Sequence, residues 1–168
     1  MFSFGNDASL NSDHAPFLLK LQEEQDNCLH ITVSLSYVGE EEEIPIDPSD
    51  HLLTDILSGA RPICPSEEDI YEIVFEDYIL YLTRNESYTS IDAREIRKGR
   101  YFTVFEKSTL LDILPQITDC QICADGSAYP GEWKHYGIIT QYHIVDVVSC
   151  NEPVIRKIPP GKTEQTPQ

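Results

Sequence analysis

The first half of this sequence has almost no basic side chains. Residues 1–80 contain 18 Asp and Glu residues but only Lys20 and Arg61 as cations, a net charge of −16. Residues 81–168 contain 11 acidic and 10 basic residues, a net charge of −1, and the two halves sum to the −17 of the whole chain. Because concentrated like charge destabilises a compact state, we interpret the asymmetry as serving solubility or contact with a positively charged partner. The first half is not expected to bind nucleic acid directly, since phosphate groups would be repelled.

Long apolar segments are also lacking. No run approaches the roughly 18 residues that span a bilayer, so no membrane partner is expected. Residues 1–7 have neither the basic nor the apolar region of a secretory signal, which predicts a cytoplasmic location. The five cysteines are an odd, scattered set, and in that compartment they are expected to be reduced thiols.

Motifs that carry catalysis or hold cofactors are absent from the sequence. It has no G-x-S-x-G, G-x-G-x-x-G, P-loop or H-E-x-x-H motif. The lone C-x-x-C pair, Cys120 and Cys123, has no second pair to complete a zinc site, and the acidic runs lack the spacing of a calcium loop. We therefore expect no metal, no cofactor and no enzymatic activity. An enzyme would need Glu132, His135 and Asp146 to converge in one cleft, whereas simple alternation points Asp146 to solvent.

The composition is typical of one globular domain. A hydrophobic fraction of 40%, with nine tyrosines and six phenylalanines in 168 residues, is enough to form a sizeable core. We predict a flexible arm over residues 1–16, a single domain over 17–158 and a disordered tail over 159–168. The predicted fold class is mainly β (α+β), a β-sandwich or curved antiparallel sheet with two short helices.

Alternation of apolar and polar residues locates the strands. In the clearest strand, 30–38, every second residue from Ile31 to Tyr37 lies on one face. Other strands are predicted at 17–21, 70–83, 101–105, 135–140, 143–149 and 154–158. The stretch 70–83 is either one long strand or a hairpin that turns at Glu76 and Asp77.

Capping signals locate the two helices. Asp47 and Pro48 are typical of a helix start and predict a short amphipathic helix over 48–58. Ser108 can cap a second helix, which Pro115 is expected to end. The loop 119–132 is predicted to be exposed.

The acidic side chains gather in two runs, both in the first half. Their members are Glu40, Glu41, Glu42, Glu43, Asp47, Asp50, Glu67, Glu68 and Asp69. Charge runs are most often solvated loops. Because these runs share one half of the chain, we predict that they form a docking surface for a basic protein partner, where complementary charge accelerates encounter.

An aromatic segment is a second candidate site. It contains Tyr129, Trp133, His135 and Tyr136. The tryptophan could stack on a sugar ring or anchor a protein partner. In the alternative interpretation, the segment is a half-buried cluster that closes the edge of a sheet.

In size, acidity, β-rich pattern and lack of an export signal or catalytic motif, the chain resembles the small acidic immunity proteins of bacterial toxin systems. The resemblance implies a cationic toxin or nuclease-like domain as partner, with residues 40–43 and 67–69 as the inhibitory surface. Inhibition would come from covering the active site or substrate groove of that domain. Two other interpretations stay open: a phage-encoded DNA mimic that blocks a host defence enzyme, and a β-sandwich that binds a carbohydrate or small ligand through the aromatic segment.

Overall fold

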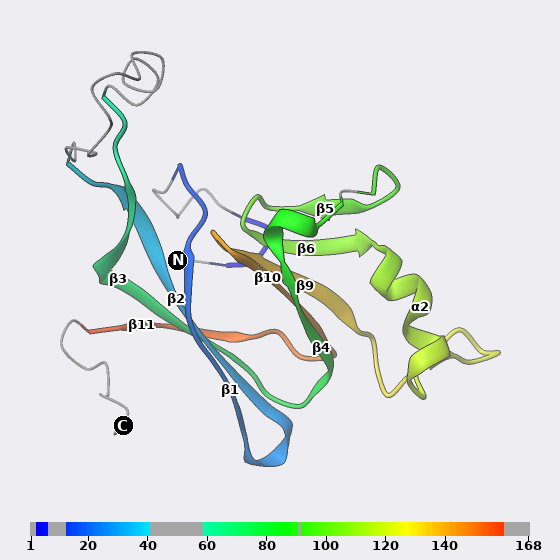
Figure 1. The fold of residues 1–168 in the computed structure, drawn as a ribbon. Coiled ribbons are helices and arrows are strands. Elements are labelled where there is room, and N and C mark those ends of the chain that lie inside the picture. Colours follow the sequence, from blue (N-terminus) through cyan, green and yellow to red (C-terminus); the bar gives the residue numbers. More distant parts are fainter. Residues whose placement is uncertain (1–2, 7–12, 41–58, 91, 160–168) are drawn as a thin grey trace.

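The computed structural model describes residues 3–6, 13–40, 59–90 and 92–159 of the chain. Within these ranges the protein is mainly β, and every pair of neighbouring strands is antiparallel, as the sequence predicts. Figure 1 shows the strands of the described residues and an α-helix that lies to one side of them.

The first sheet has four strands in the order β1-β2-β3-β11. They are β1 (Phe17–Glu24), β2 (Cys28–Val38), β3 (Ile63–Phe75) and β11 (Val154–Ile158). The register aligns one apolar residue from each strand in a single row, formed by Leu21, Ile31, Ile73 and Ile155. This row lies on the face that the alternation of strand 30–38 predicts to be buried.

The second sheet has five strands in the order β4-β10-β9-β6-β5. They are β4 (Tyr78–Asn85), β5 (Ile96–Lys98), β6 (Phe102–Lys107), β9 (Lys134–Ile139) and β10 (His143–Ser149). A separate short pair, β7 (Gln121–Ile122) and β8 (Ala128–Tyr129), lies within the predicted loop 119–132.

Two short connections carry the chain between the sheets. Glu76 and Asp77 lead from β3 to β4, which belong to different sheets, so the stretch 70–83 is neither a hairpin nor one long strand. Asp77 has a φ of 57°, in the left-handed region, and this allows the abrupt change of direction. Residues 150–153 lead back from β10 to β11. The Asn151 side chain donates a hydrogen bond to the Glu76 carbonyl (3.4 Å), so the two crossings lie side by side.

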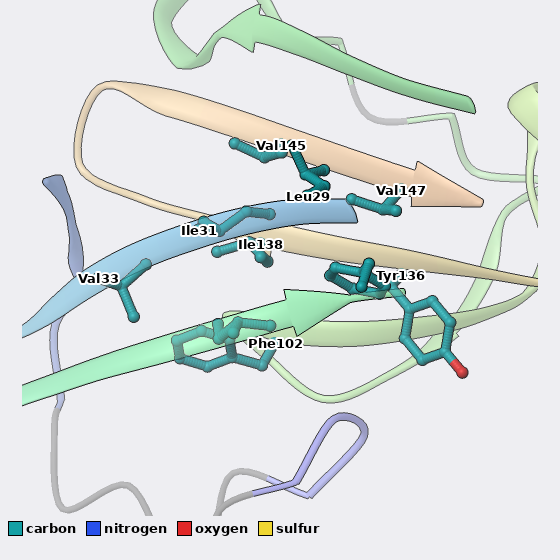
Figure 2. Close-up of a cluster of buried hydrophobic side chains, with 10 residues drawn as sticks. Leu29, Ile31, Val33, Phe102, Tyr136, Ile138, Val145 and Val147 are labelled. Carbon is teal, nitrogen blue, oxygen red and sulfur yellow. The ribbon is translucent and has the colours of Figure 1, made fainter. Parts of the chain in front are cut away.

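One hydrophobic cluster takes its side chains from both sheets (Figure 2). Its members are Leu29, Ile31, Val33, Ile73 and Phe75 from the first sheet, and Phe102, Tyr136, Ile138, Val145 and Val147 from the second. Each fully buried aliphatic or aromatic side chain stabilises the fold by roughly 1.5–3 kcal/mol. The core therefore joins the two sheets.

The described part of the chain contains one α-helix, α2 (Thr109–Ile117), where two short helices were predicted. The other predicted helix, 48–58, lies outside the described residues. The expected cap is confirmed, because Ser108 Oγ accepts a hydrogen bond from the Leu111 N–H (3.1 Å). The prediction that Pro115 ends the helix is wrong. Proline removes only one N–H, and the fully buried Leu114 holds the next turn in place.

The described residues of the predicted N-terminal arm contact the rest of the protein. The Phe4 ring packs edge-on against Phe75, Phe102 and Tyr136, with centroid distances of 6.1, 5.8 and 5.2 Å. The carbonyl groups of residues 13–16 all accept hydrogen bonds from side chains or backbone of the domain. The division into arm, domain and tail stays a prediction, but residues 3–6 and 13–16 are part of the packed structure.

Candidate functional site

The two predicted acidic runs differ in how much of them the structure describes. Glu40, Glu67 and Glu68 are exposed, whereas Asp69 is half-buried and its carboxylate pairs with Lys157 Nζ at 2.7 Å. The remaining members, Glu41, Glu42, Glu43, Asp47 and Asp50, lie outside the described residues.

Strands β2 and β3 extend beyond their neighbours in the first sheet. Pairing of β1 with β2 reaches only Ser34, and pairing of β11 with β3 reaches only Ile70. Among the described residues, 36–38 and 63–65 pair only with each other, and both strands continue to the upper left in Figure 1. We call this two-stranded extension, with Gly39, Glu40 and residues 61–62 at its end, the β2–β3 ribbon.

A four-residue bulge in β3 positions the second acidic run next to the ribbon in the chain. Ser34 lies opposite Ile70 and Ser36 opposite Pro65, so residues 66–69 face a single residue of β2. Ser66 Oγ accepts hydrogen bonds from the backbone N–H groups of residues 68 and 69 (3.2 and 3.1 Å). The Ser34 hydroxyl donates to the Ser66 carbonyl at 2.6 Å. These bonds give the bulge a defined turn, which holds the exposed Glu67 and Glu68 outward.

Apolar side chains lie on the same ribbon. Tyr37 is 53% exposed and Val38 is 41% exposed. Alternation in the sequence groups Tyr37 with Ile31 and Val33, but those two residues are buried whereas Tyr37 is exposed, because the core ends before the strand does. We define the ribbon surface as Tyr37, Val38, Glu40, Glu67 and Glu68. Sequence reasoning found its acids but missed its two apolar members.

The structure does not gather the predicted aromatic segment into one pocket. Tyr129 lies on β8 and is 55% exposed. Trp133 is half-buried and packs against the cluster that contains Leu110 and Leu114 of α2. His135 and Tyr136 are both buried, but successive residues of β9 point to opposite faces of the second sheet.

His135 belongs to a chain of buried hydrogen bonds. Arg84 Nε and Nη2 donate to the two carboxylate oxygens of Asp146, at 2.8 and 3.1 Å. Asp146 Oδ1 also lies 2.9 Å from His135 Nε2, and His135 Nδ1 lies 2.8 Å from Ser108 Oγ. The Phe105 ring stacks on the imidazole with a centroid distance of 4.1 Å. The chain joins β4, β10, β9 and the start of α2, so the expectation that Asp146 points to solvent is wrong.

These residue types recur in acyl-transfer enzymes, but their arrangement here is structural. A carboxylate only accepts, so His135 Nε2 carries the proton toward Asp146, and in the neutral imidazole Nδ1 accepts from the Ser108 hydroxyl. Hydrolase triads use the ring nitrogens the other way round. Ser108 is 1% exposed, its oxygen already caps α2, and the depression beside it has no room for a water molecule. Glu132, the third member of the hypothetical cleft, is exposed and takes no part in these bonds.

The cysteines form no metal cluster in the described part of the chain. There, no group of three or more His, Cys, Asp or Glu side chains could hold a metal ion. All five thiols are free, with Cys120 buried beneath α2 and Cys123 half-buried. Burial raises the pKa of the Cys150 thiol, and the neighbouring Cys120 raises it further.

Comparison of the chain with protein-family models, with curated proteins and with solved structures found no match. In the ranges that the structure describes, no helix is long and apolar enough to cross a membrane. The charges, contacts and exposed groups of the chain itself therefore carry the functional conclusion.

Proposed function

We propose that the protein is an acidic binding protein that inhibits a basic protein partner, as an immunity protein neutralises a toxin. The observation that carries the proposal is the ribbon surface, because the exposed residues Glu40, Glu67 and Glu68 and the exposed residues Tyr37 and Val38 all lie on or next to the free end of β2 and β3. Cationic toxin domains, including nucleases, have the charge that such a surface attracts.

The carboxylates of the bulge are free to meet a partner. Asp69 is already paired with Lys157, but the ion pairs of the described residues include neither Glu67 nor Glu68. Residues 1–80 carry a net charge of −16, and this half of the chain includes β1, β2 and β3 of the first sheet. Complementary charge of this kind speeds encounter and sets the orientation of a partner more than it sets affinity.

We expect the apolar members of the ribbon surface to supply most of the binding affinity. Interface affinity comes mostly from a few anchors, and tyrosine is among the residues most enriched there. Tyr37 can fill a partner pocket while the carboxylates of Glu40, Glu67 and Glu68 remain partly solvated at the rim of the interface. The proposal therefore assigns affinity to Tyr37 and Val38, and encounter rate to the glutamates.

The ribbon extends from a part of the first sheet that is packed in the core. We take the two sheets to form the predicted sandwich, since one core cluster draws side chains from both. Leu29, Ile31 and Val33 anchor β2 in that core before the strand continues into the ribbon. A surface that is already ordered loses less conformational entropy on binding.

The test is capture from the native host followed by measurement with the purified partner. The intact chain serves as bait at low and high salt, and partners are identified by mass spectrometry. We expect a basic protein that is retained at low salt and weakened at high salt. Its inhibition is then measured directly by titrating the purified partner's activity with the chain.

Two double variants test whether the partner binds at the ribbon surface. Glu67→Lys with Glu68→Lys reverses the bulge, and Asp119→Lys with Glu132→Lys reverses two exposed acids outside the first sheet. Both doubles change the net charge equally. We expect the first to slow association by about tenfold or more and the second to have a much smaller effect. Equal effects would reduce the role of the surface to net charge alone, and the proposed surface would be rejected.

A further inference from the structure

A cavity of about 300 Å³ lies where β6, β9, the start of β11 and residues 3–4 meet. Its apolar walls come from Phe4, Val104 and Ile155, and its polar groups include Lys134, Tyr136 and Glu152. Ligand sites are typically apolar hollows of about 300–1,000 Å³ with a few polar groups, and this cavity is at the lower end of that range. None of its residues belongs to the ribbon surface.

The Tyr136 hydroxyl is a buried polar group of this cavity that has no hydrogen-bond partner among the described residues. The residue is 3% exposed, and its ring packs against Phe4 and Phe75. Among the described residues no hydrogen bond is formed by its oxygen, which points away from the other labelled side chains in Figure 2. A buried hydroxyl without a partner is costly, and a ligand oxygen in the cavity would satisfy it.

Glu152 and the Tyr136 hydroxyl influence each other across the cavity. Burial, together with a smaller contribution from the charge of Glu152, raises the pKa of Tyr136 to about 12. The hydroxyl is therefore protonated at neutral pH and can both donate and accept a hydrogen bond.

The Lys134–Glu152 ion pair in the lining favours a ligand without net charge. Lys134 Nζ and Glu152 Oε1 are 2.9 Å apart, so the two charged groups neutralise each other at the rim. An anionic ligand would have to displace Glu152, and a cationic one would have to displace Lys134. A neutral molecule leaves the pair intact.

We propose that this cavity binds a small, uncharged, largely apolar organic molecule through one oxygen that hydrogen-bonds to the Tyr136 hydroxyl. The apolar body of the ligand packs against Phe4, Val104 and Ile155. This site is separate from the partner-binding surface and does not depend on it.

Three probes of similar shape test the charge preference. These are 2-phenylethanol, phenylacetate and 2-phenylethylamine, which differ mainly in whether they are neutral, anionic or cationic near neutral pH. Each is titrated into the labelled full chain and followed by backbone amide NMR. We expect 2-phenylethanol to shift the amides of Val104, Lys134 and Tyr136 with a Kd of about 1 mM, and the charged probes to bind at least about tenfold more weakly.

Single substitutions tie binding to the hydroxyl and to the cavity. Tyr136→Phe removes only the oxygen and should weaken 2-phenylethanol at least about fivefold, with the rest of the spectrum unchanged. Tyr142→Phe, at a 67% exposed tyrosine, is the matched control and should bind as the unmodified chain does. Val104→Phe fills the cavity and should abolish binding. The Glu67→Lys, Glu68→Lys double variant should bind the alcohol normally, which separates this site from the ribbon surface.

Three results would overturn the proposal. One is the absence of any shift at the cavity residues with all three probes at about 20 mM, well above the expected Kd. Another is equal binding of 2-phenylethanol to the Tyr136→Phe variant. The third is tighter binding of a charged probe, or shifts confined to the second cavity of about 160 Å³ around Arg84, Ile139 and Ile144.

Discussion

The carboxylate of Asp146 accepts hydrogen bonds from Arg84 and His135 while only 1% of the residue is exposed. Asp146→Asn leaves one acceptor oxygen where three donor groups converge, and it places an amide N–H₂ against one of them. Because a buried group then loses its partner, we expect the free energy of unfolding to fall by about 2–4 kcal/mol. Urea denaturation measures this change.

The control is the same substitution at an exposed pair. Asp92 accepts hydrogen bonds from the Arg94 side chain, and that guanidinium lies mostly in solvent. Water and salt screen this pair, so Asp92→Asn should cost clearly less than Asp146→Asn. Similar losses at the two sites would contradict a structural role for the buried chain of hydrogen bonds.

Tyr136 gives a second prediction, in alkaline solution. Its pKa is raised from 10.0 to about 12 in the folded protein, chiefly by burial. Between these values the unfolded chain loses the proton while the folded protein keeps it, so stability is complete below about pH 10 and falls as pH rises toward 12. The loss in the free energy of unfolding that is due to Tyr136 reaches about 2–3 kcal/mol when the pH has passed the pKa of the folded protein.

Comparison with Tyr136→Phe isolates that contribution. The pKa values of Tyr78 and Tyr81 are also raised, chiefly by burial for Tyr78 and chiefly by a hydrogen bond to Glu23 for Tyr81, and both residues act in the same direction in the two proteins. Unfolding free energies measured from pH 8 to 12 should therefore fall less steeply in the variant. Parallel curves would show that Tyr136 does not titrate as its burial requires.

At the scale of elements, Pro115 lies in the middle of α2. Its side chain is exposed to solvent, and it removes one helical hydrogen bond. Pro115→Ala restores the N–H that can donate to the Leu111 carbonyl and leaves the buried Leu114 in place. We expect the free energy of unfolding to rise by about 1–3 kcal/mol. Thermal unfolding followed by circular dichroism measures it, and an unchanged or lower melting temperature would contradict this explanation.

The positions of most strands could be predicted from the sequence, because alternation is local. The partners of the strands could not, since pairing depends on distant residues. A turn at Glu76 and Asp77 could be predicted, and the chain does turn there. No nearby residue indicates that the chain passes from one sheet to the other at this point. The bulge at residues 66–69 was missed for a similar reason, because it exists only relative to Leu35 on another strand.

The candidate site was predictable in part. The acids of residues 67–69 stood out as a charge run, and their exposure at 67 and 68 follows from the bulge. The exposure of Tyr37 could not be predicted, because alternation marks a face but does not show where the core ends. His135 and Asp146 were noticed as residue types, yet their contact requires the register of β9 and β10, which places them on the same face of neighbouring strands.

At the scale of the whole molecule, the net charge of −17 opposes folding through self-repulsion. Salt screens such repulsion, with a Debye length that falls from about 30 Å at 0.01 M to about 8 Å at 0.15 M. We therefore expect the melting temperature to rise by several degrees between about 0.01 and 0.3 M NaCl, with most of the rise at the low end. A melting temperature that is flat or falls with NaCl would show that ion pairs offset the excess acid.

The order of strands in the first sheet has a consequence for synthesis of the protein. Strands β1, β2 and β3 are translated first, but their neighbour β11 is translated only after every strand of the second sheet. On the ribosome, the edge of β3 from Ile70 to Val74 thus waits unpaired through the translation of about half the chain. Exposed edges of this kind invite pairing with other chains. The nascent protein depends on β11 to pair with the edge that β3 leaves open.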